Sequence, residues 1–323
     1  MKRIIVPLSG GLGNQLFQYY AGKSLKPRDL LIDFSLSKTD SHRNGIDILE
    51  LLSEGDQKIC NIKFPFIQKL AKKTFGFCTR YSTEIPSGTK APMFYHAVLT
   101  ILSSLIFSIY FGKPCHTFIS KGIGCTSRVR KKTFGHSILI GYFQTLQPFD
   151  GDSGYLHQEF LRKVLEKEVT EPQEKEIANP RNLSIHMRLG DYLNEPKIGC
   201  LDPLYFARAI EKLDQHKKID RIILFSDNED FALSELNVVT SIPISVYPTA
   251  SHSSSYALFA LSNASNLIIS NSSFSWWAAM ISSCRQEATI AAPEKWFAGQ
   301  PDPISLVPPN WTRIESSWRS LEP

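Results

Sequence analysis

Residues 184–192 read Ser-Ile-His-Met-Arg-Leu-Gly-Asp-Tyr, and the rest of the chain is organised around them. The apolar run over residues 183–187 predicts a buried strand. This strand leads into a loop that carries Arg188 and Asp191, and we expect Gly190 to let that loop turn sharply. A guanidinium presents a planar fork of donors that fits two phosphate oxygens at once. The segment therefore predicts either an anion site centred on Arg188 or an ordinary surface ion pair between Arg188 and Asp191.

Strand and helix signals alternate through the second half of the chain. Strands are predicted over residues 183–187, 222–225, 267–269 and 289–292. Helices are predicted from the Asp202-Pro203 pair, which is typical of a helix start, around residues 256–261, and through Trp276 and Trp277. This alternation predicts a parallel, doubly wound sheet, in which ligands bind outside the carboxyl ends of the strands.

Polar residues follow three of these strands. Arg188 supplies a cation, and Asp227 can accept hydrogen bonds from a base or a ribose. Asn271, Ser272 and Ser273 stand at a predicted helix start, where hydroxyls, backbone N–H groups and the helix dipole all favour an anion. The following Phe274 can stack on a base. The alternative for the serines is a capped helix that needs no ligand.

The N-terminal half opens with a strand over residues 3–6, a glycine-rich turn over 9–14 and a helix. Such a turn can point backbone N–H groups at a ligand, although its spacing is neither the dinucleotide fingerprint nor the Walker lysine loop. A tight structural turn, with Asn14 capping the helix, is the alternative. Further strands are predicted over residues 30–33 and 138–140.

The segments between these strands are less regular. Residues 92–112 are apolar and long enough to span a bilayer, but Thr100, Ser104 and Ser108 form one polar stripe, which favours a packed or interfacial helix. Residues 113–133 are basic and read as irregular, and residues 155–169 predict an amphipathic helix. Residues 171–181 carry two prolines and predict an inter-domain connection.

Two patterns invite a chemical interpretation that we do not adopt. Asp150-Gly151-Asp152 matches an Asp-x-Asp metal pattern, but it stands in a turn without a convincing strand before it, and we interpret it as a loop. His186 falls where the strand is buried, so a hydrogen-bonded structural histidine is favoured over a general base.

The composition of the chain limits the class of protein and the kinds of ligand that need to be considered. The 323 residues are 42% hydrophobic and 21% charged, which is typical of a soluble chain of about two domains. The formal charge of +5 fits an anionic ligand or a loose approach to a membrane surface, and no basic arm with interleaved aromatics indicates nucleic acid. The six cysteines form no Cys-x-x-Cys pair, and no apolar signal segment opens the sequence. We therefore expect free thiols in a reducing compartment.

Several stretches together resemble one known family. They are Gly10-Gly11-Leu12-Gly13-Asn14-Gln15-Leu16-Phe17-Gln18-Tyr19, Gly141-Tyr142-Phe143-Gln144, His186-Met187-Arg188-Leu189-Gly190-Asp191-Tyr192, Phe225-Ser226-Asp227, Asn271-Ser272-Ser273-Phe274-Ser275-Trp276-Trp277 and Pro293-Glu294-Lys295-Trp296-Phe297. In this order they are similar to the signatures of the bacterial α-1,2-fucosyltransferases, glycosyltransferase family 11. Residues 49–134 offer little to match.

The resemblance implies an α/β fold of the GT-B type, with two Rossmann-like domains facing a cleft. Residues 1–175 would form the acceptor-side domain and residues 176–323 the domain that binds GDP-fucose. The implied reaction is inverting, metal-independent transfer of L-fucose from GDP-β-L-fucose to a sugar hydroxyl, commonly O2 of a galactose in a surface glycan. We expect a cytoplasmic enzyme with at most peripheral contact to the inner face of the membrane, acting on a galactose-containing acceptor that includes lipid-linked forms, with no nucleic-acid partner.

The resemblance also assigns site residues. Arg188 would bind the donor diphosphate and stabilise the departing GDP, and Asp191 is the first candidate for the general base, or else it orients Arg188. Glu195 and Asp33 are further candidates by position. No metal ligand and no cofactor are expected. The expected donor-binding residues are Gly11, Gly13, Asn14, His186, Arg188, Asp227, Asn271, Ser272, Ser273 and Phe274.

Two positions depart from the family pattern. Leu189 stands where many relatives have a second arginine, and Ala257 stands where relatives often carry an acidic residue. The preference for donor or acceptor is therefore open. A related transferase that uses another GDP-sugar is one alternative, and a catalytically silent sugar- or nucleotide-binding protein is another.

Overall fold

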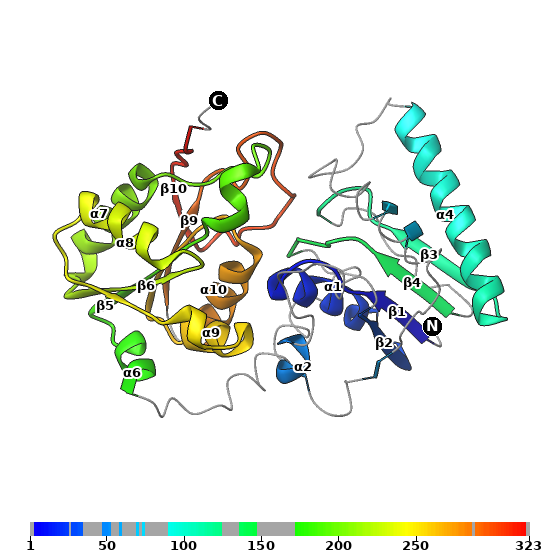
Figure 1. Ribbon diagram of the computed structural model, residues 1–323, viewed down its shortest axis with the longest axis horizontal. Helices are drawn as coiled ribbons and strands as arrows, with labels where there is room; N and C mark the ends of the chain where they lie inside the picture. The colour runs from blue at the N-terminus through cyan, green and yellow to red at the C-terminus, as the bar shows by residue number, and fades with distance from the viewer. Residues whose placement is uncertain are drawn as a thin grey trace. The chain divides into compact units, whose positions relative to one another are not determined.

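The computed structural model describes residues 3–25, 27–34, 47–52, 58–59, 69–70, 73–74, 90–124, 136–146, 172–285 and 288–320. The chain divides into two compact units. The first consists of Met1–Glu159 with Pro301–Leu306, and the second of Phe160–Gln300 with Val307–Pro323. Each unit has its own parallel sheet (Figure 1). The sequence-based boundary at residues 175/176 stays a prediction.

The first unit is built on a four-stranded sheet in the order β2-β1-β4-β3, with every described pairing parallel. Its described elements are β1 (Arg3–Pro7), α1 (Leu12–Ser24), β2 (Asp29–Asp33), α2 (Asp47–Leu51), α4 (Lys90–Phe111), β3 (Cys115–Ile119) and β4 (His136–Ile140). The strands predicted over residues 3–6, 30–33 and 138–140 are confirmed. The apolar residues of β1 are almost fully buried, which places this strand in the middle of the unit's core.

Strand β3 corrects a sequence prediction. It lies within residues 113–133, which the sequence indicated to be irregular. The strand has only five residues, and its side chains alternate, with Cys115, Thr117 and Ile119 buried and His116 exposed. Because β3 is an edge strand and includes polar residues, its apolar pattern is too short to distinguish it from a loop.

The second unit is built on a six-stranded sheet, and all of its described pairings are parallel. Its described elements are α6 (Pro172–Ala178), β5 (Asn182–Met187), η3 (Gly190–Asn194), α7 (Pro203–Lys217), β6 (Arg221–Ser226), α8 (Glu229–Val239), β7 (Ile244–Val246), η4 (Thr249–Ser251), α9 (Ser254–Leu261), β8 (Asn266–Ile269), α10 (Ser273–Arg285), β9 (Thr289–Pro293) and β10 (Thr312–Ile314).

The strand order of this sheet is β10-β9-β8-β5-β6-β7. When the six strands are renumbered from β5 in chain order and the sheet is read from β7 to β10, the order is 3-2-1-4-5-6. This is the strand order of the Rossmann fold. Helices cover both faces, with α7 and α8 on one side and α9 and α10 on the other (Figure 1). Leu183, Ile185 and Met187 of β5 pack with the core beneath α7 and α8, whereas His186 on the opposite face contacts α10. The predicted doubly wound parallel sheet is confirmed.

Two α-helices and two strands of the second unit were not predicted. Residues 171–181 were interpreted as a connection, but Pro172 is the first residue of the short helix α6, which buries Glu174 and Ile177. A proline is tolerated at that position because the N–H it lacks has no partner within the helix. Helix α8 and the edge strands β7 and β10, each three residues long, were also missed.

Some predictions concern residues outside the described part of the chain. These are the helix over residues 155–169, the Asp150-Gly151-Asp152 loop and the cysteines Cys60, Cys78 and Cys125. Within the described part, Cys115 and Cys200 are buried free thiols and Cys284 is an exposed one.

Candidate functional site

The candidate site lies at the carboxyl ends of β5 and β8, which are neighbours in the six-stranded sheet. From β5 the chain proceeds in one direction through β6 to β7, and then returns to the other side of β5 through β8, β9 and β10. The strand order therefore reverses between β5 and β8. In open α/β sheets such a reversal leaves a crevice outside the strand ends, where ligands bind.

Arg188 is the first residue after β5, and its guanidinium is held by two carboxylates. Its Nη1 lies 2.9 Å from Asp227 Oδ2, and its Nη2 donates to Asp191 Oδ1 at 2.6 Å. Its Cζ lies 5.4 Å from the centre of the Tyr192 ring. Only 23% of the Arg188 side chain is exposed, so its contact with Asp191 is not an ordinary surface ion pair. Contacts on three sides orient this cation before any ligand binds.

Burial and charge act on Arg188 in opposite directions. Burial alone would lower the pKa of the guanidinium, but the nearby carboxylates of Asp227 and Asp191 outweigh it and raise the pKa. Arg188 therefore stays charged at every physiological pH. The carboxylate of Asp227 also accepts a hydrogen bond from the backbone N–H of Leu189 at 2.9 Å, which ties the end of β6 to the loop after β5.

Gly190 has a different role from the one its sequence position suggested. The described glycines with a left-handed φ are Gly10, Gly112, Gly141 and Gly199, so Gly190 is not needed for a special turn. A Cβ at this position would collide with Oδ2 of Asp227. The glycine therefore provides the space that allows Asp227 to reach Arg188.

Ser270 joins the two strand ends at the reversal. Its Oγ accepts a hydrogen bond from the backbone N–H of Arg188 at 3.2 Å and lies 3.1 Å from His186 Nδ1. Burial, reinforced by the charge of Arg188, lowers the pKa of His186 to about 3. His186 is therefore neutral near pH 7, and its geometry confirms the prediction of a hydrogen-bonded structural histidine.

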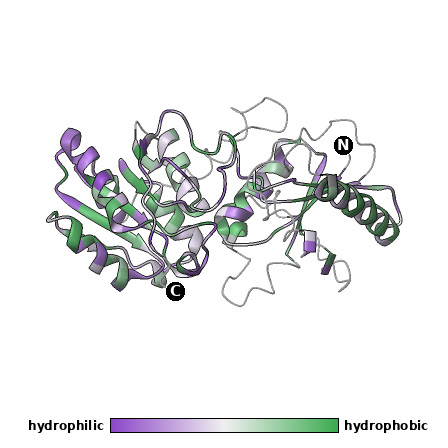
Figure 2. Ribbon diagram, turned by 90° about the horizontal axis from the view of Figure 1, so that it is seen from above, coloured by the Kyte–Doolittle hydropathy of each residue, from purple (hydrophilic) through white to green (hydrophobic). Residues whose placement is uncertain are grey.

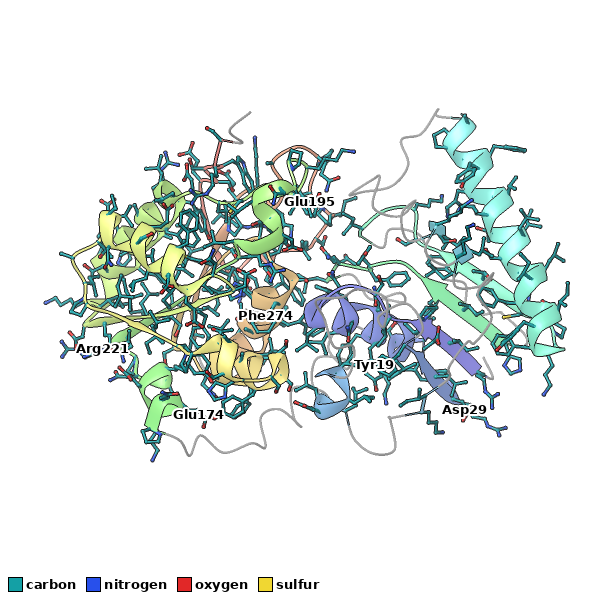
Figure 3. All side chains as sticks on the ribbon, viewed as in Figure 1. Tyr19, Asp29, Glu174, Glu195, Arg221 and Phe274 are labelled. Atoms are coloured by element: carbon teal, nitrogen blue, oxygen red, sulfur yellow. The ribbon has the colours of Figure 1, made fainter. Side chains whose placement is uncertain are left out.

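Helix α10 starts at the same place. Ser272 precedes the helix and its Oγ accepts from the backbone N–H of Phe274 at 3.3 Å, so the hydroxyl acts as a helix cap. Ser273 and Phe274 form the first turn, and both are partly exposed (Figure 3 labels Phe274). The ring of Phe274 lies 5.3 Å from that of His186. The start of α10 therefore places a positive dipole end and an aromatic ring beside Arg188.

Asn271 leaves one acceptor unused. Its Nδ2 donates to the carbonyls of Ile198 and Gly199 at 3.2 and 3.0 Å. Its Oδ1 is buried and has no hydrogen-bond partner among the described residues. Leaving a buried polar atom without a partner costs free energy, so such an atom at a strand end is a candidate contact for a ligand.

The remaining predicted donor-binding residues belong to the first unit. Gly11 precedes α1, and Gly13 and Asn14 lie in its first turn. Asn14 does not cap the helix; its Oδ1 accepts from Nε2 of Gln144 at 2.8 Å, which joins the turn after β1 to the segment after β4. The site in the second unit thus gathers His186, Arg188, Asp191, Asp227, Asn271, Ser272, Ser273 and Phe274.

The turn before α1 is held mainly by two buried glutamines. The Gln18 amide exchanges two hydrogen bonds with the backbone of Ser9, at 2.9 and 3.2 Å, and Gln15 Nε2 donates to the carbonyl of Gly10 at 2.9 Å. Gly10 has a φ of +78°, which explains a glycine at that position. These contacts account for the fixed shape of the turn.

The three candidates for the general base occupy different places. Asp191 lies in η3 and is half exposed, and its Oδ1 accepts from Nη2 of Arg188. Glu195 follows η3 and is exposed (Figure 3). Asp33 ends β2 in the first unit and is 1% exposed. The assignment of Asp191 stays a prediction.

Sequence reasoning missed several residues of this site. Ser270 was recognised only as a strand end, and the role of Tyr192 was not assigned. In the first unit, the contact of Gln144 with Asn14 was not predicted either. The available signal was positional, because each of them follows a strand of a parallel sheet within a few residues. Leu189, one of the two expected departures from the family pattern, is 1% exposed and packs in the core, so this position faces away from the strand ends.

A Rossmann-ordered sheet that presents a guanidinium and a helix start at its reversal point is typical of units that bind nucleotides. Two units that each contain a parallel sheet agree with the GT-B architecture that the sequence predicted. The family model of Glycosyl transferase family 11 matches residues 110–315, and the chain belongs to this family.

The chain is similar to two curated proteins of Escherichia coli. The O-antigen biosynthesis glycosyltransferase WbnK is 27% identical over 327 residues, covering 95% of this chain and 99% of that protein. An alpha-1,2-colitosyltransferase is 24% identical over 331 residues, covering 98% of this chain and all of that protein.

Solved structures give weaker likenesses. E. coli ADP-heptose LPS heptosyltransferase II aligns with a TM-score of 0.47 at 10% identity, covering 97% of this chain and 90% of that one. The fucosyltransferase NodZ from Bradyrhizobium aligns with a TM-score of 0.44 at 12% identity, covering 86% and 91%. POFUT1 in complex with GDP aligns with a TM-score of 0.41 at 11% identity, covering 90% and 98%.

Proposed function

We propose that this glycosyltransferase transfers L-fucose from GDP-β-L-fucose to a sugar hydroxyl, with inversion at the anomeric carbon and without a metal ion. The observation that carries the proposal is the position of Arg188 between the ends of β5 and β8, beside the start of α10. The second unit binds the donor in this proposal, and the first unit serves the acceptor.

The proposed chemistry follows from where charge develops. The bond from the anomeric carbon to the diphosphate breaks, the acceptor oxygen attacks from the opposite face, and its proton passes to a base. Negative charge then grows on the β-phosphate of the departing GDP. A guanidinium that is already fixed in place stabilises that charge without the reorganisation that water would need.

Arg188 has the capacity for this role. A guanidinium has five N–H donors, more than the two described ion pairs require. With two carboxylates around one cation, the group carries a net negative charge in the absence of donor. We propose that the exposed Asp191 gives way to the diphosphate, while Asp227, which is less exposed, keeps Arg188 oriented.

The remaining donor contacts are assigned by chemistry. The start of α10 offers backbone N–H groups and the positive end of a helix dipole to phosphate. The unused Oδ1 of Asn271 offers an acceptor for a hydroxyl or amino group of the donor. The partly exposed ring of Phe274 offers a surface on which a base can stack.

The acceptor hydroxyl is proposed to be O2 of a galactose in a bacterial surface glycan, including lipid-linked forms. The names of the two relatives support this, since one acts in O-antigen biosynthesis and the other makes an α-1,2 linkage. Action on the cytoplasmic side follows from the nucleotide-sugar donor and is part of the same proposal.

A second candidate is transfer of colitose. It is favoured by the likeness to the alpha-1,2-colitosyltransferase over 98% of this chain. Colitose is L-fucose without the hydroxyl at carbon 3, so the two donors differ by one hydrogen-bonding group. A site that hydrogen-bonds this hydroxyl rejects the deoxy sugar strongly, whereas an apolar pocket separates the two sugars weakly.

The test is release of GDP from a panel of donors, namely GDP-fucose, GDP-colitose, GDP-mannose and UDP-galactose. Each donor is supplied with lactose or N-acetyllactosamine, in magnesium and in EDTA. We expect acceptor-dependent release from GDP-fucose that survives EDTA, and an equatorial-to-axial (β to α) change at the anomeric carbon of the transferred fucose. Release from GDP-colitose alone supports the second candidate, and release that requires metal overturns the proposed mechanism. A silent binding protein would show thermal stabilisation by GDP and no turnover on any donor–acceptor pair, a result that a wrong choice of acceptor also gives.

A further inference from the structure

Helix α4 uses one face to close the open edge of the four-stranded sheet. Ser104 Oγ accepts from the backbone N–H of Thr117 at 2.9 Å, and Ser108 Oγ accepts from that of Cys115 at 2.8 Å. His96 Nε2 lies 2.9 Å from the carbonyl oxygen of Ile119. β3 is the edge strand, so the polar stripe of α4 satisfies backbone groups that would otherwise face solvent.

The opposite face of α4 is apolar and exposed. Phe94, Ile101, Leu105 and Ile109 are 73%, 60%, 56% and 81% exposed. Spacings of seven and four residues place them on one stripe of the helix. We define the outer face of α4 as this stripe with the flanking exposed residues Met93, Tyr95, Leu102 and Tyr110. Figure 2 shows α4 as a long helix in hydrophobic colours over most of its length.

A contiguous apolar stripe of this length is unusual on the surface of a soluble protein and marks an interaction site. The segment Ala91–Phe111 also has the length and composition of a membrane span. A membrane span surrounded by lipid is not compatible with the face of α4 that packs on the sheet. On that face Ser103 and Phe107 are fully buried, and Ser104 and Ser108 accept hydrogen bonds from β3. Only the outer face is available to a partner.

The charge of the sequence segment that contains α4 indicates which kind of partner the outer face of α4 contacts. Between Glu84 and Asp150 the sequence contains no acidic residue. The same stretch contains seven basic residues. Lys90 begins α4, Lys113 and Lys121 lie in the described segment after it, and Arg128, Arg130, Lys131 and Lys132 lie outside the described part of the chain. Lys113 is the second residue after the end of α4 and is exposed. A second copy of this chain would bring the same positive charge to the interface, whereas anionic lipid headgroups are complementary to it.

We propose that the outer face of α4 lies in the boundary between headgroups and acyl chains of an anionic bilayer, which makes this enzyme a peripheral membrane protein. The helix lies in the plane of the interface, with its docked face on β3 and its apolar stripe toward the lipid. This is the arrangement of a monotopic amphipathic helix, in which apolar burial and attraction to anionic lipid act together. The inference rests on α4 alone and is independent of which sugar is transferred.

The test is co-sedimentation of the full chain with vesicles. One set contains equal phosphatidylglycerol and phosphatidylcholine, and the other phosphatidylcholine alone. The test variant is Leu105→Glu/Ile109→Glu, on the outer face. The matched control is Val238→Glu on α8 in the second unit, which places the same residue at a position that is 84% exposed. Lys113→Glu tests the charge separately.

We expect the wild type and Val238→Glu to bind the anionic vesicles equally. The double variant should bind at least roughly tenfold more weakly, since it places two charges where apolar side chains would insert. Lys113→Glu should reduce binding roughly fivefold or more, because each basic residue near an anionic surface adds attraction of that order. Binding to phosphatidylcholine alone should be weaker for all.

Three results would overturn the proposal. They are the absence of wild-type binding to anionic vesicles, equal binding by the double variant and by Val238→Glu, and a dimer in sedimentation velocity that the double variant abolishes. Circular dichroism and thermal melting establish that the variants are folded. The single variant Ile109→Gln, at an 81% exposed position, repeats the test if the double variant does not fold.

Discussion

Arg188 is oriented by groups that come from three different segments of the chain. Asp191 and Tyr192 belong to η3, Asp227 follows β6, and Ser270 follows β8 and holds the backbone of Arg188. The sequence predicted the cation and its pairing with Asp191, whereas Asp227 was expected to contact the donor and its ion pair with Arg188 was not predicted. It did not predict Ser270, since a serine at a strand end has no distinctive signature.

The residue most sensitive to small changes in this arrangement is Gly190. Gly190→Ala should push Asp227 away from Arg188, because the added Cβ would collide with Oδ2 of Asp227. Losing a charged hydrogen bond costs about 1.5–3 kcal/mol, so we expect kcat/KM for the donor to fall roughly tenfold to a hundredfold. Steady-state kinetics and a thermal melt measure this loss and show that the fold persists. Asn194→Ala, at the other end of η3, is the control and should retain activity; equal kinetics for the two variants would contradict the role of Gly190.

His186 should make the protein more sensitive to acid. Its pKa is lowered from 6.5 to about 3 by burial, so the unfolded chain takes up a proton before the folded one does. The stabilising effect is complete above pH 6.5 and is lost as the pH falls toward 3, by at most about 1.4 kcal/mol per pH unit. Urea unfolding at pH 7, 6 and 5 should therefore show a smaller decrease in the free energy of unfolding for His186→Gln than for the wild type. Parallel pH dependences would mean that His186 is not the group responsible.

At the scale of elements, helix α7 illustrates how a local signal can determine structure. Asp202 Oδ1 accepts from the backbone N–H groups of Leu204 and Tyr205 at 3.0 and 3.2 Å, and Pro203 is the first residue of the helix. The Asp-Pro pair predicted this start correctly because both preferences are set by backbone chemistry. The start of α1 gave a false signal, since Gln15 and Gln18 hold the turn and Asn14 bonds to Gln144 instead.

Removing the cap of α7 should affect stability without affecting the site. Asp202→Ala loses both cap bonds and the hydrogen bond from Ser317, at 2.7 Å, and should reduce the free energy of unfolding by about 1–2 kcal/mol. Urea unfolding measures this loss. Asp230→Ala, in the first turn of α8 where Asn228 is the cap, removes an aspartate without removing a cap and should have a smaller effect. If both variants lose the same stability, the cap is not the cause.

The strands that escaped prediction share a physical reason. Strands β3, β7 and β10 are short and lie at sheet edges. Each therefore has only a few apolar residues, and these are interrupted by polar residues. The buried central strand β5 was the easiest to recognise because its apolar run is continuous. Helix α4 was predicted with its polar stripe, but only the structure shows that this stripe satisfies the edge of β3.

For the molecule as a whole, the two units differ in what the sequence could establish. The second unit follows a strand-and-helix alternation, and its strand order then determines where a ligand binds. The first unit also includes the short segment Pro301–Leu306 from the C-terminal part of the chain. The carbonyl of Ser305 accepts from the N–H of Leu146 at 2.9 Å, a contact between residues too distant in sequence for any local pattern to predict.

The most direct test of the central claim compares fucosyl transfer by the wild type, Arg188→Ala and Arg181→Ala. Arg181 lies just before β5 and pairs with Asp220 at 2.6 Å, so its variant also removes an arginine ion pair from the second unit. Arg188→Ala should lower kcat about a hundredfold to a thousandfold, corresponding to about 2.7–4 kcal/mol of lost transition-state stabilisation, and should weaken the thermal stabilisation by GDP. Arg181→Ala should behave like the wild type in both measurements. Near-normal turnover by a folded Arg188→Ala variant would contradict the assignment of Arg188 to the donor diphosphate.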